Sequence, residues 1–437
     1  MQIRQFKRSD FEFSKSSWSQ SGRVLDVVGQ MIEASMPKCS LGTIVQILAS
    51  DILPAEVVGF KNGRTLLMPY TNIGGIYVGA RVEPITVHDH IWAGSHLLGH
   101  VLDPFLNSLN GSFSLSPDAR LCPLQKEAPN PLKRSRIHQP LPLGVRAIDG
   151  LLTFGEGQRT GVMAGSGVGK SVLMGMIARG SSADINVIAL IGERGREVRE
   201  FIERELGEEG LKKSVVIAVT SDQSPLMRIR GAFVATAIAE YFSSCNKRVL
   251  LMLDSLTRVA QAQREIGLAA GEPPTTKGYP PSVYSLLPRL LERCGPQEKG
   301  HGSISGLYTV LVDGDNFNDP IPDAVRSILD GHINLSRKLA SQGHFPAIEV
   351  TSSASRVMID VVPEQHRKIA TELKALISQY EENYDLIQLG SYEKGTNPKL
   401  DRALLLMPRI EEYLKQDTTK LSDYKDTIQG LIRLLHS

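Results

Sequence analysis

A glycine-rich stretch near the middle of the chain has residue types and spacing that suit phosphate binding. The sequence GVMAGSGVGKS runs from Gly161 to Ser171, between an apolar, strand-like segment and a helix-like one. In such a loop the backbone N–H groups converge on phosphate oxygens, the lysine contacts the terminal phosphates, and the hydroxyl that follows binds Mg²⁺. The expected nucleotide-binding residues are Gly165, Ser166, Gly167, Val168, Gly169, Lys170, Ser171 and Val172.

One position of this loop departs from the usual G-x-x-x-x-G-K-S pattern. Ala164 stands where the first glycine is expected. Alanine keeps a small side chain at the bend and is compatible with the loop if its φ is negative. The alternative is a glycine-rich turn without a ligand, but the strand before the loop and the helix after it favour a phosphate site.

Two acidic residues end apolar segments further along the chain. Asp254 ends RVLLMLD, and we expect it to hold Mg²⁺ through water. Glu193 ends NVIALIGE, and we expect it to act as general base or to position the attacking water, because carboxylates at the carboxyl ends of parallel strands face the ligand crevice. The alternative for Glu193 is a helix-start carboxylate paired with Arg194 or Arg196.

Strand-like and helix-like segments alternate around these residues, which predicts an α/β fold with a parallel sheet and helices on both faces. The predicted strands are 160–163, 186–191, 214–219, 248–253 and 307–312, and the predicted helices are 170–179, 196–206, 227–242 and 284–293.

The flanking regions have different patterns. Short β-rich runs before residue 98, with a type I′ turn at KNGR, predict a small barrel or sandwich. Prolines between Pro123 and Pro142 predict an extended connector. Past Pro363, apolar residues at three-or-four spacing predict helices. The expected domains are a terminal segment 1–22, either frayed or a docking helix for a partner, a barrel 23–98, a nucleotide-binding domain 99–365 and a helical domain 366–437.

Composition excludes several classes of protein. The chain has 437 residues and a net charge of +2, which is too near neutral to indicate nucleic acid as the main partner. No apolar run approaches the roughly 18 residues that cross a bilayer. The four cysteines lie far apart, as is typical of reduced thiols in a cytosolic protein. The histidines of VHDHIWAGSHLLGH could suggest zinc, but no nearby cysteine or carboxylate pair completes a site.

Longer motifs resemble a known family. GERGREV, DSLTR, GYPPSVYSLLPRLLERCG and FPAIEVTSSASR are similar to the hexameric ATPases that include the rotary ATP synthase α and β subunits and termination factor Rho. The resemblance is strongest to the protein-export ATPases of flagella and type III secretion systems, which also carry alanine at the position of Ala164. It covers roughly residues 22–437. It implies a RecA-like P-loop ATPase core with an N-terminal small β-barrel and a C-terminal helical domain.

The resemblance also implies roles for two further residues. Arg356, in SASRVM, matches the family's arginine finger, which reaches into the neighbouring subunit's site; the alternative is an ion pair within the chain. Phe345 matches the aromatic residue that stacks on adenine; the alternative is a core aromatic. Glu349 stands where the family usually has aspartate, which puts the local pairing in doubt.

The resemblance implies that the chain hydrolyses ATP with Mg²⁺ to power protein export, including chaperone release, cargo unfolding and delivery to the export gate. Because Glu193 and Arg356 lie on one chain, a homo-hexamer of identical copies is expected. The expected partners are a stator protein at the N-terminus, a central stalk protein, the export gate and chaperone–substrate complexes, at the cytoplasmic side of the inner membrane. The alternatives are a rotary ATP synthase-type subunit or a Rho-like RNA translocase.

Overall fold

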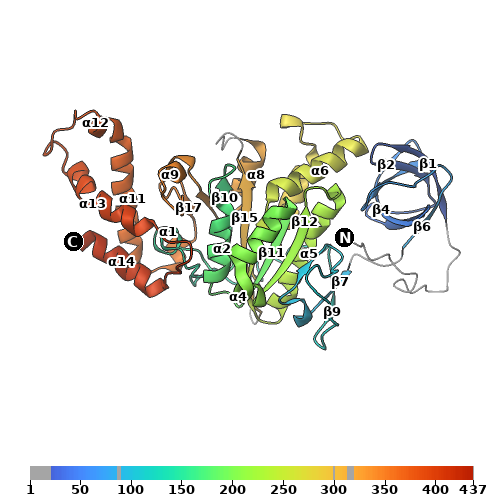
Figure 1. The fold of residues 1–437 in the computed structure, drawn as a ribbon, viewed down its shortest axis with the longest axis horizontal. Coiled ribbons are helices and arrows are strands. Elements are labelled where there is room, and N and C mark those ends of the chain that lie inside the picture. The colour runs from blue at the N-terminus through green and yellow to red at the C-terminus, as the bar shows by residue number, and fades with distance from the viewer. Residues whose placement is uncertain (1–20, 86–89, 299–300, 313–318, 437) are drawn as a thin grey trace.

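The computed structural model describes residues 21–85, 90–298, 301–312 and 319–436. A β-barrel lies at one end of the molecule, a group of helices lies at the other, and a helix-covered sheet lies between them (Figure 1). The predicted terminal segment 1–22 falls outside the described residues except for its last two positions. No helix in the described ranges is long and apolar enough to cross a membrane.

Six antiparallel strands close the N-terminal barrel in the order β1-β2-β5-β4-β3-β6. They are β1 (Gly22–Val28), β2 (Met31–Ser35), β3 (Ile44–Leu48), β4 (Ile52–Lys61), β5 (Arg64–Pro69) and β6 (Arg81–Pro84). Every second residue points inward, and Ile32, Val45, Ile47, Leu67 and Val82 fill the interior. Asn62 and Gly63 have φ values of 50° and 73°, which confirms the tight turn predicted at KNGR.

The central sheet has the strand order β17-β16-β10-β15-β13-β11-β12-β8. The strands from β16 to β8 run parallel to one another, whereas β17 and the short β14, which pairs with β15, are antiparallel. Their bounds are β8 (Val101–Leu102), β10 (Arg159–Ala164), β11 (Ile185–Glu193), β12 (Ser214–Thr220), β13 (Arg248–Asp254), β14 (Gly295–Pro296), β15 (Ser303–Leu311), β16 (Gly331–Asn334) and β17 (Ala354–Ser355). A separate pair consists of β7 (His90–Ala93) and β9 (Arg120–Pro123). The predicted parallel sheet is therefore confirmed.

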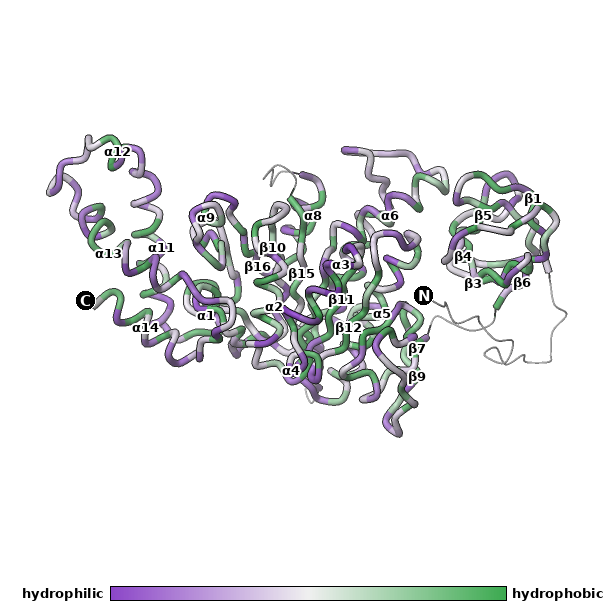
Figure 2. The backbone as a smooth tube through the Cα atoms, in the orientation of Figure 1, coloured by the Kyte–Doolittle hydropathy of each residue, from purple (hydrophilic) through white to green (hydrophobic). Residues whose placement is uncertain are grey.

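Helices cover both faces of this sheet, as the alternating pattern predicts. Along β11, Val187 and Ala189 pack in one hydrophobic cluster with α5, α6 and α7, whereas Ile188 and Leu190 pack in another with α2 and the C-terminal helices. Figure 2 shows the central strands as mostly hydrophobic and α3 as hydrophilic. Because both faces of β11 are buried, its sequence is a continuous apolar run.

The helices of the central region include four that match predicted ones and several that no sequence pattern located. Their bounds are α1 (Arg146–Leu151), α2 (Lys170–Gly180), α3 (Gly195–Glu200), η3 (Phe201–Leu206), α4 (Gly207–Lys212), α5 (Pro225–Ser244), α6 (Leu256–Ala270), α7 (Pro281–Leu291), α8 (Pro320–Ile328), α9 (Arg337–Ser341) and α10 (Met358–Val361), with short 3₁₀ turns η2 (Ser95–Leu97) and η4 (Thr276–Gly278). Of these helices, α1, α4, α6, α8, α9 and α10 were not predicted, and neither was strand β16 of the sheet.

The C-terminal region is helical, as expected. It consists of α11 (Glu364–Glu382), α12 (Tyr384–Gln388), α13 (Pro398–Leu414) and α14 (Tyr424–His436). The predicted apolar face of α11 is buried at Ile369, Leu373, Leu376 and Ile377. These side chains belong to the same hydrophobic cluster as α2, so the C-terminal helices share a core with the nucleotide-binding region.

Candidate active site

The glycine-rich loop joins β10 to α2 and has the backbone geometry of a phosphate cradle. Gly167 and Gly169 have φ values of 77° and 94°, which only glycine adopts without strain. Gly169 is the N-cap of α2 and no side chain caps this helix end, so its first N–H groups point toward the loop. Ala164 is a strand residue paired with Leu311 and is not among the described non-glycine residues with positive φ, so alanine fits there.

Lys170 and the two predicted carboxylates meet in one cluster. The Lys170 Nζ atom lies 2.5 Å from Asp254 Oδ1 and 3.2 Å from Glu193 Oε1. All three side chains are largely buried, and Asp254 is the most buried, with 4% of its side chain exposed. The alternative pairing of Glu193 with Arg194 or Arg196 does not occur in the structure. Arg194 pairs with Glu197, and Arg196 pairs with Glu200.

A break in strand regularity aims Glu193 into the cluster. The register of β11 against β12 shifts between Ile191 and Glu193, and Gly192 between them has a φ of 73°. A Cβ atom on Gly192 would lie 2.9 Å from Arg258 side-chain atoms, so close packing also requires glycine here. Bulges of this kind commonly redirect a side chain next to an active site.

Burial and neighbouring charges change the acidity of the cluster. Burial, with the nearby Asp254 charge, raises the pKa of Glu193 to about 7, although Lys170 opposes this shift. For Lys170, burial alone would lower the pKa, but the charges of Asp254 and Glu193 outweigh burial and raise it. Glu193 is therefore poised to gain or lose a proton near neutral pH, as a general base requires.

Thr309 is a further member of the cluster that sequence reasoning missed. Its hydroxyl donates to Asp254 Oδ1 at 2.6 Å, and both side chains are buried. Thr309 lies on β15, which separates β10 from β13 in the sheet. Its strand was predicted, but the contact depends on strand order, which the sequence pattern does not give.

A cavity of about 470 Å³ opens beside the glycine-rich loop. Its lining includes Gly169, Val172, Phe345, Pro346, Thr418 and Thr419. Phe345 is 41% exposed, so it is not a core aromatic, and a Cβ atom on Gly169 would lie 3.6 Å from its ring. The cavity can accept a flat apolar group next to the phosphate loop. Thr418 and Thr419, from the C-terminal region, were not anticipated.

Arg356 lies away from this cluster. It follows β17 at the edge of the sheet, and its side chain is exposed, with no ion pair to any residue in the described part of the chain. The predicted alternative, an ion pair within the chain, is therefore absent from the described residues. Glu349 accepts a hydrogen bond from the Ser352 hydroxyl at 2.6 Å, which keeps its charge within its own loop.

The histidine-rich stretch does not form a cluster in the part that is described. His96 contacts the Ser116 hydroxyl at 2.9 Å, and His100 packs on the Phe113 ring. Across the described ranges, no group of three or more histidine, cysteine or acidic residues has an arrangement that could hold a metal ion. His88 lies outside these ranges.

Comparison with known proteins accounts for this arrangement. Residues 144–355 match the family described as ATP synthase alpha/beta family, nucleotide-binding domain, and residues 362–433 match the T3SS EscN ATPase C-terminal domain. The flagellum-specific ATP synthase of Bacillus subtilis is 50% identical over 425 residues, which cover 96% of this chain and 96% of that protein. The chain belongs to the ATP synthase alpha/beta family.

Other members of the ATP synthase alpha/beta family place it among export ATPases. The type 3 secretion system ATPase of Xanthomonas euvesicatoria is 48% identical over 413 residues, covering 94% of this chain and 93% of that protein. The assembled ATPase EscN of enteropathogenic E. coli superimposes with a TM-score of 0.90 at 46% identity, covering 95% of this chain and all of that one. The chain is thus an ATPase of the flagellar and type III secretion class, and the RNA translocase and rotary-subunit alternatives are not supported.

Proposed function

We propose that the chain hydrolyses Mg²⁺-bound ATP in a closed ring of six identical copies, with Arg356 of one copy completing the site of the next. The observation that carries this proposal is the separation of Arg356 from the Lys170 cluster within one chain. Ser355 pairs with Gly331, which pairs with Thr160, so Arg356 lies near the amino end of β10. The phosphate loop starts at the opposite end, after Ala164.

This separation exceeds the reach of an arginine side chain. Two strand spacings across the sheet and four residues along β10 amount to on the order of 15 Å. The Arg356 side chain is exposed, and its guanidinium has no hydrogen bond or ion pair to any of the described residues. The guanidinium is therefore available to another molecule. Homologous proteins assemble, as the structure of assembled EscN illustrates. A guanidinium supplied across an interface can accelerate phosphoryl transfer by about 10³–10⁵-fold.

The residues around the loop fit a nucleotide with its metal. The N–H groups of Gly165 to Val172 would bind phosphate oxygens, and the Phe345 ring would stack on the base. Ser171 is exposed in the first turn of α2 and, within the described residues, its hydroxyl makes no hydrogen bond, so it is free to bind Mg²⁺ together with Asp254. The metal would neutralise charge on the phosphate oxygens. Glu193 would accept a proton from water or orient it.

Membership of this family supports a proposal for the role in the cell. The ring would be peripheral at the cytoplasmic side of the inner membrane and would power chaperone release, cargo unfolding and delivery to the export gate. EscN has been seen in complex with its central stalk EscO, which supports a stalk partner for this chain as well. The N-terminal segment would dock a stator protein, and the C-terminal helices would contact chaperone and cargo.

Mixing two inactive variants tests the ring. Glu193→Gln lacks the base but keeps Arg356, and Arg356→Ala lacks the finger but keeps Glu193. In mixed rings, some interfaces join an intact Arg356 to an intact Glu193, so ATP turnover should reappear on mixing. Wild-type turnover per chain should also rise with protein concentration. If mixtures stay as inactive as the separate variants, the shared site is wrong.

A further inference from the structure

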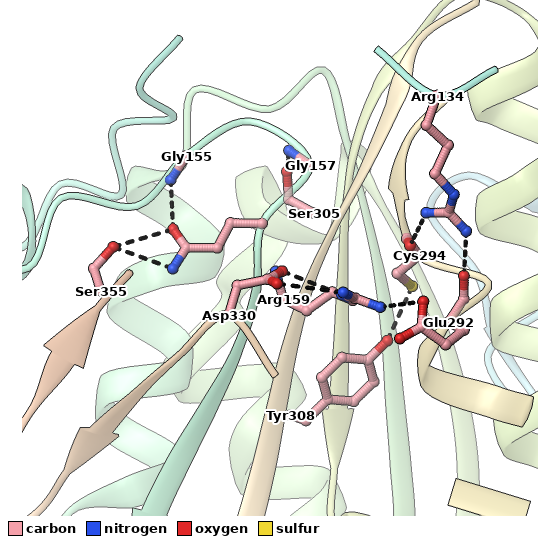
Figure 3. A network of polar contacts seen from close by, with 11 residues as sticks. Arg134, Gly155, Gly157, Arg159, Glu292, Cys294, Ser305, Tyr308, Asp330 and Ser355 are labelled. Carbon is pink, nitrogen blue, oxygen red and sulfur yellow. Dashed lines mark hydrogen bonds and ion pairs between the residues drawn. The ribbon is translucent and has the colours of Figure 1, made fainter. Parts of the chain in front are cut away.

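The segment that carries Arg356 is held to the sheet by several polar contacts. The Ser355 hydroxyl donates to the Thr153 carbonyl at 2.9 Å and accepts from the Gln158 side-chain amide at 3.1 Å. Figure 3 shows Ser355 within the polar network at this end of the sheet. The Arg356 N–H donates to the Asp330 carbonyl at 2.9 Å, and the Asp330 carboxylate is paired with Arg159. The backbone at Arg356 is therefore fixed on the sheet side.

The same segment is held on its other side by the first C-terminal helix, α11. The Lys374 ammonium donates to the Ser353 carbonyl at 3.2 Å, three residues before Arg356. About two helical turns further along α11, Glu381 accepts a hydrogen bond from the Thr351 hydroxyl at 2.9 Å. Two side chains of α11 thus contact the stretch from Thr351 to Ser353. Strand β16 contacts it as well, since the Asn334 N–H donates to the Ser353 hydroxyl and the Asn334 side-chain amide donates to the Ser352 carbonyl, both at 2.9 Å.

Lys374 is an unusual residue for this place. Burial lowers its pKa to about 8, and no carboxylate is paired with it among the described residues. Lys374 is half-buried, and desolvating an ammonium group that has no counter-ion costs stability. Its one hydrogen bond in the described structure goes to the backbone of the Arg356 segment. The contact is therefore better explained by what it does to that segment.

We propose that Lys374 is a positioning residue for Arg356, through which α11 couples the C-terminal helices to hydrolysis at the neighbouring copy's site. The coupling is direct because α11 also packs its apolar face on the core of the C-terminal region. A partner that shifts α11 would break the Lys374–Ser353 hydrogen bond and loosen one side of the segment that positions the guanidinium. This inference rests on the proposed role of Arg356 across the interface.

The test compares Lys374→Met with a matched control on the same helix. Lys368 is exposed, and its one ion pair within the described residues is with Glu364, so Lys368→Met removes the same charge without touching the segment. Lys374→Met should lower kcat about 10- to 100-fold, as misplacement of a reacting group does, with KM and ATP binding unchanged. Lys368→Met should match the wild type. A proportional loss of ATP binding, or no loss of kcat, would overturn the proposal.

A second variant guards against a simple folding defect. Thr351→Val removes the other contact with α11, on a different residue, and should lower kcat in the same direction. Thermal melting of each variant would identify a chain that fails to fold. Folded Thr351→Val and Lys374→Met proteins with wild-type kcat would contradict the proposal.

A double variant separates this inference from the proposed function. If Lys374 acts through Arg356, adding Lys374→Met to Arg356→Ala should cause no further loss of kcat. An additional loss equal to that of the single variant would show that Lys374 acts elsewhere. If Arg356→Ala retained full turnover, the proposed role of Arg356 across the interface would be wrong, whatever the effect of Lys374→Met.

Discussion

The Lys170 ammonium lies 2.5 Å from the Asp254 carboxylate, although the two residues are 84 positions apart in the sequence. The lysine that would contact phosphates is therefore paired with the carboxylate that would hold the metal. If nucleotide and Mg²⁺ bind as proposed, the phosphates would pair with Lys170 and Asp254 would hold the metal, so both members of the pair would keep an opposite charge.

Lys170→Met should destabilise the protein without nucleotide. It leaves Asp254, which is almost fully buried, without its counter-charge, and breaking such a pair costs about 3–5 kcal/mol. Urea unfolding of the variant measures this loss. Lys212→Met is the control, because its ion pair with Glu209 is exposed to solvent and contributes little to stability. Equal stability of the two variants would contradict the assignment.

Glu193→Gln should lose about 10²- to 10⁴-fold in ATP turnover, as expected when a general base is removed, while it still binds ATP. A steady-state assay and a fluorescent-nucleotide titration measure the two properties. Glu200→Gln, which alters an exposed carboxylate on the following helix, is the control and should retain full turnover. A variant that loses binding and turnover in proportion would indicate a structural carboxylate.

The pH dependence of turnover should reflect the raised pKa of Glu193. A base works only when ionised, so kcat/KM, which reports the free enzyme, should fall as the pH drops below about 7. The acid limb should disappear in the Glu193→Gln variant, whose residual activity should be flat across this range. An acid limb centred near pH 4 would mean that burial does not raise the pKa of Glu193 in the free enzyme.

Phe345→Ala should weaken ATP binding about tenfold, because stacking of a base on an aromatic ring contributes roughly 1–3 kcal/mol. The maximal turnover should stay close to that of the wild type, since the ring lies beside the loop and not in the Lys170 cluster. Phe60→Ala removes an exposed ring from the barrel and is the matched control. Unchanged affinity in Phe345→Ala would place the base elsewhere.

The parts of the site that the sequence predicts are local. The loop from Gly165 to Ser171 is continuous, and Glu193 and Asp254 each end an apolar run whose direction is set by the parallel sheet. The position of Thr309 was not predictable, because it depends on β15 lying beside β13. Thr418 and Thr419 reach the cavity from the C-terminal region, and no local pattern connects them to Phe345.

The missed elements have similar causes. Helix α6 begins directly after Asp254, with the Ser255 hydroxyl accepting from the Arg258 N–H as an N-cap. The residues that follow Ser255 have an amphipathic pattern that could have predicted this helix. Strand β16 is only four residues long, and its pairing with β10 and β17 becomes evident only when the sheet is assembled.

Pairing of Gly22 with Val82 joins the first strand of the barrel to the last. A sheet rolled up in this way exposes no row of unpaired backbone N–H and C=O groups for a foreign strand. Neighbouring copies can therefore contact one another at the barrel through side chains, but no strand of one barrel can extend the sheet of another.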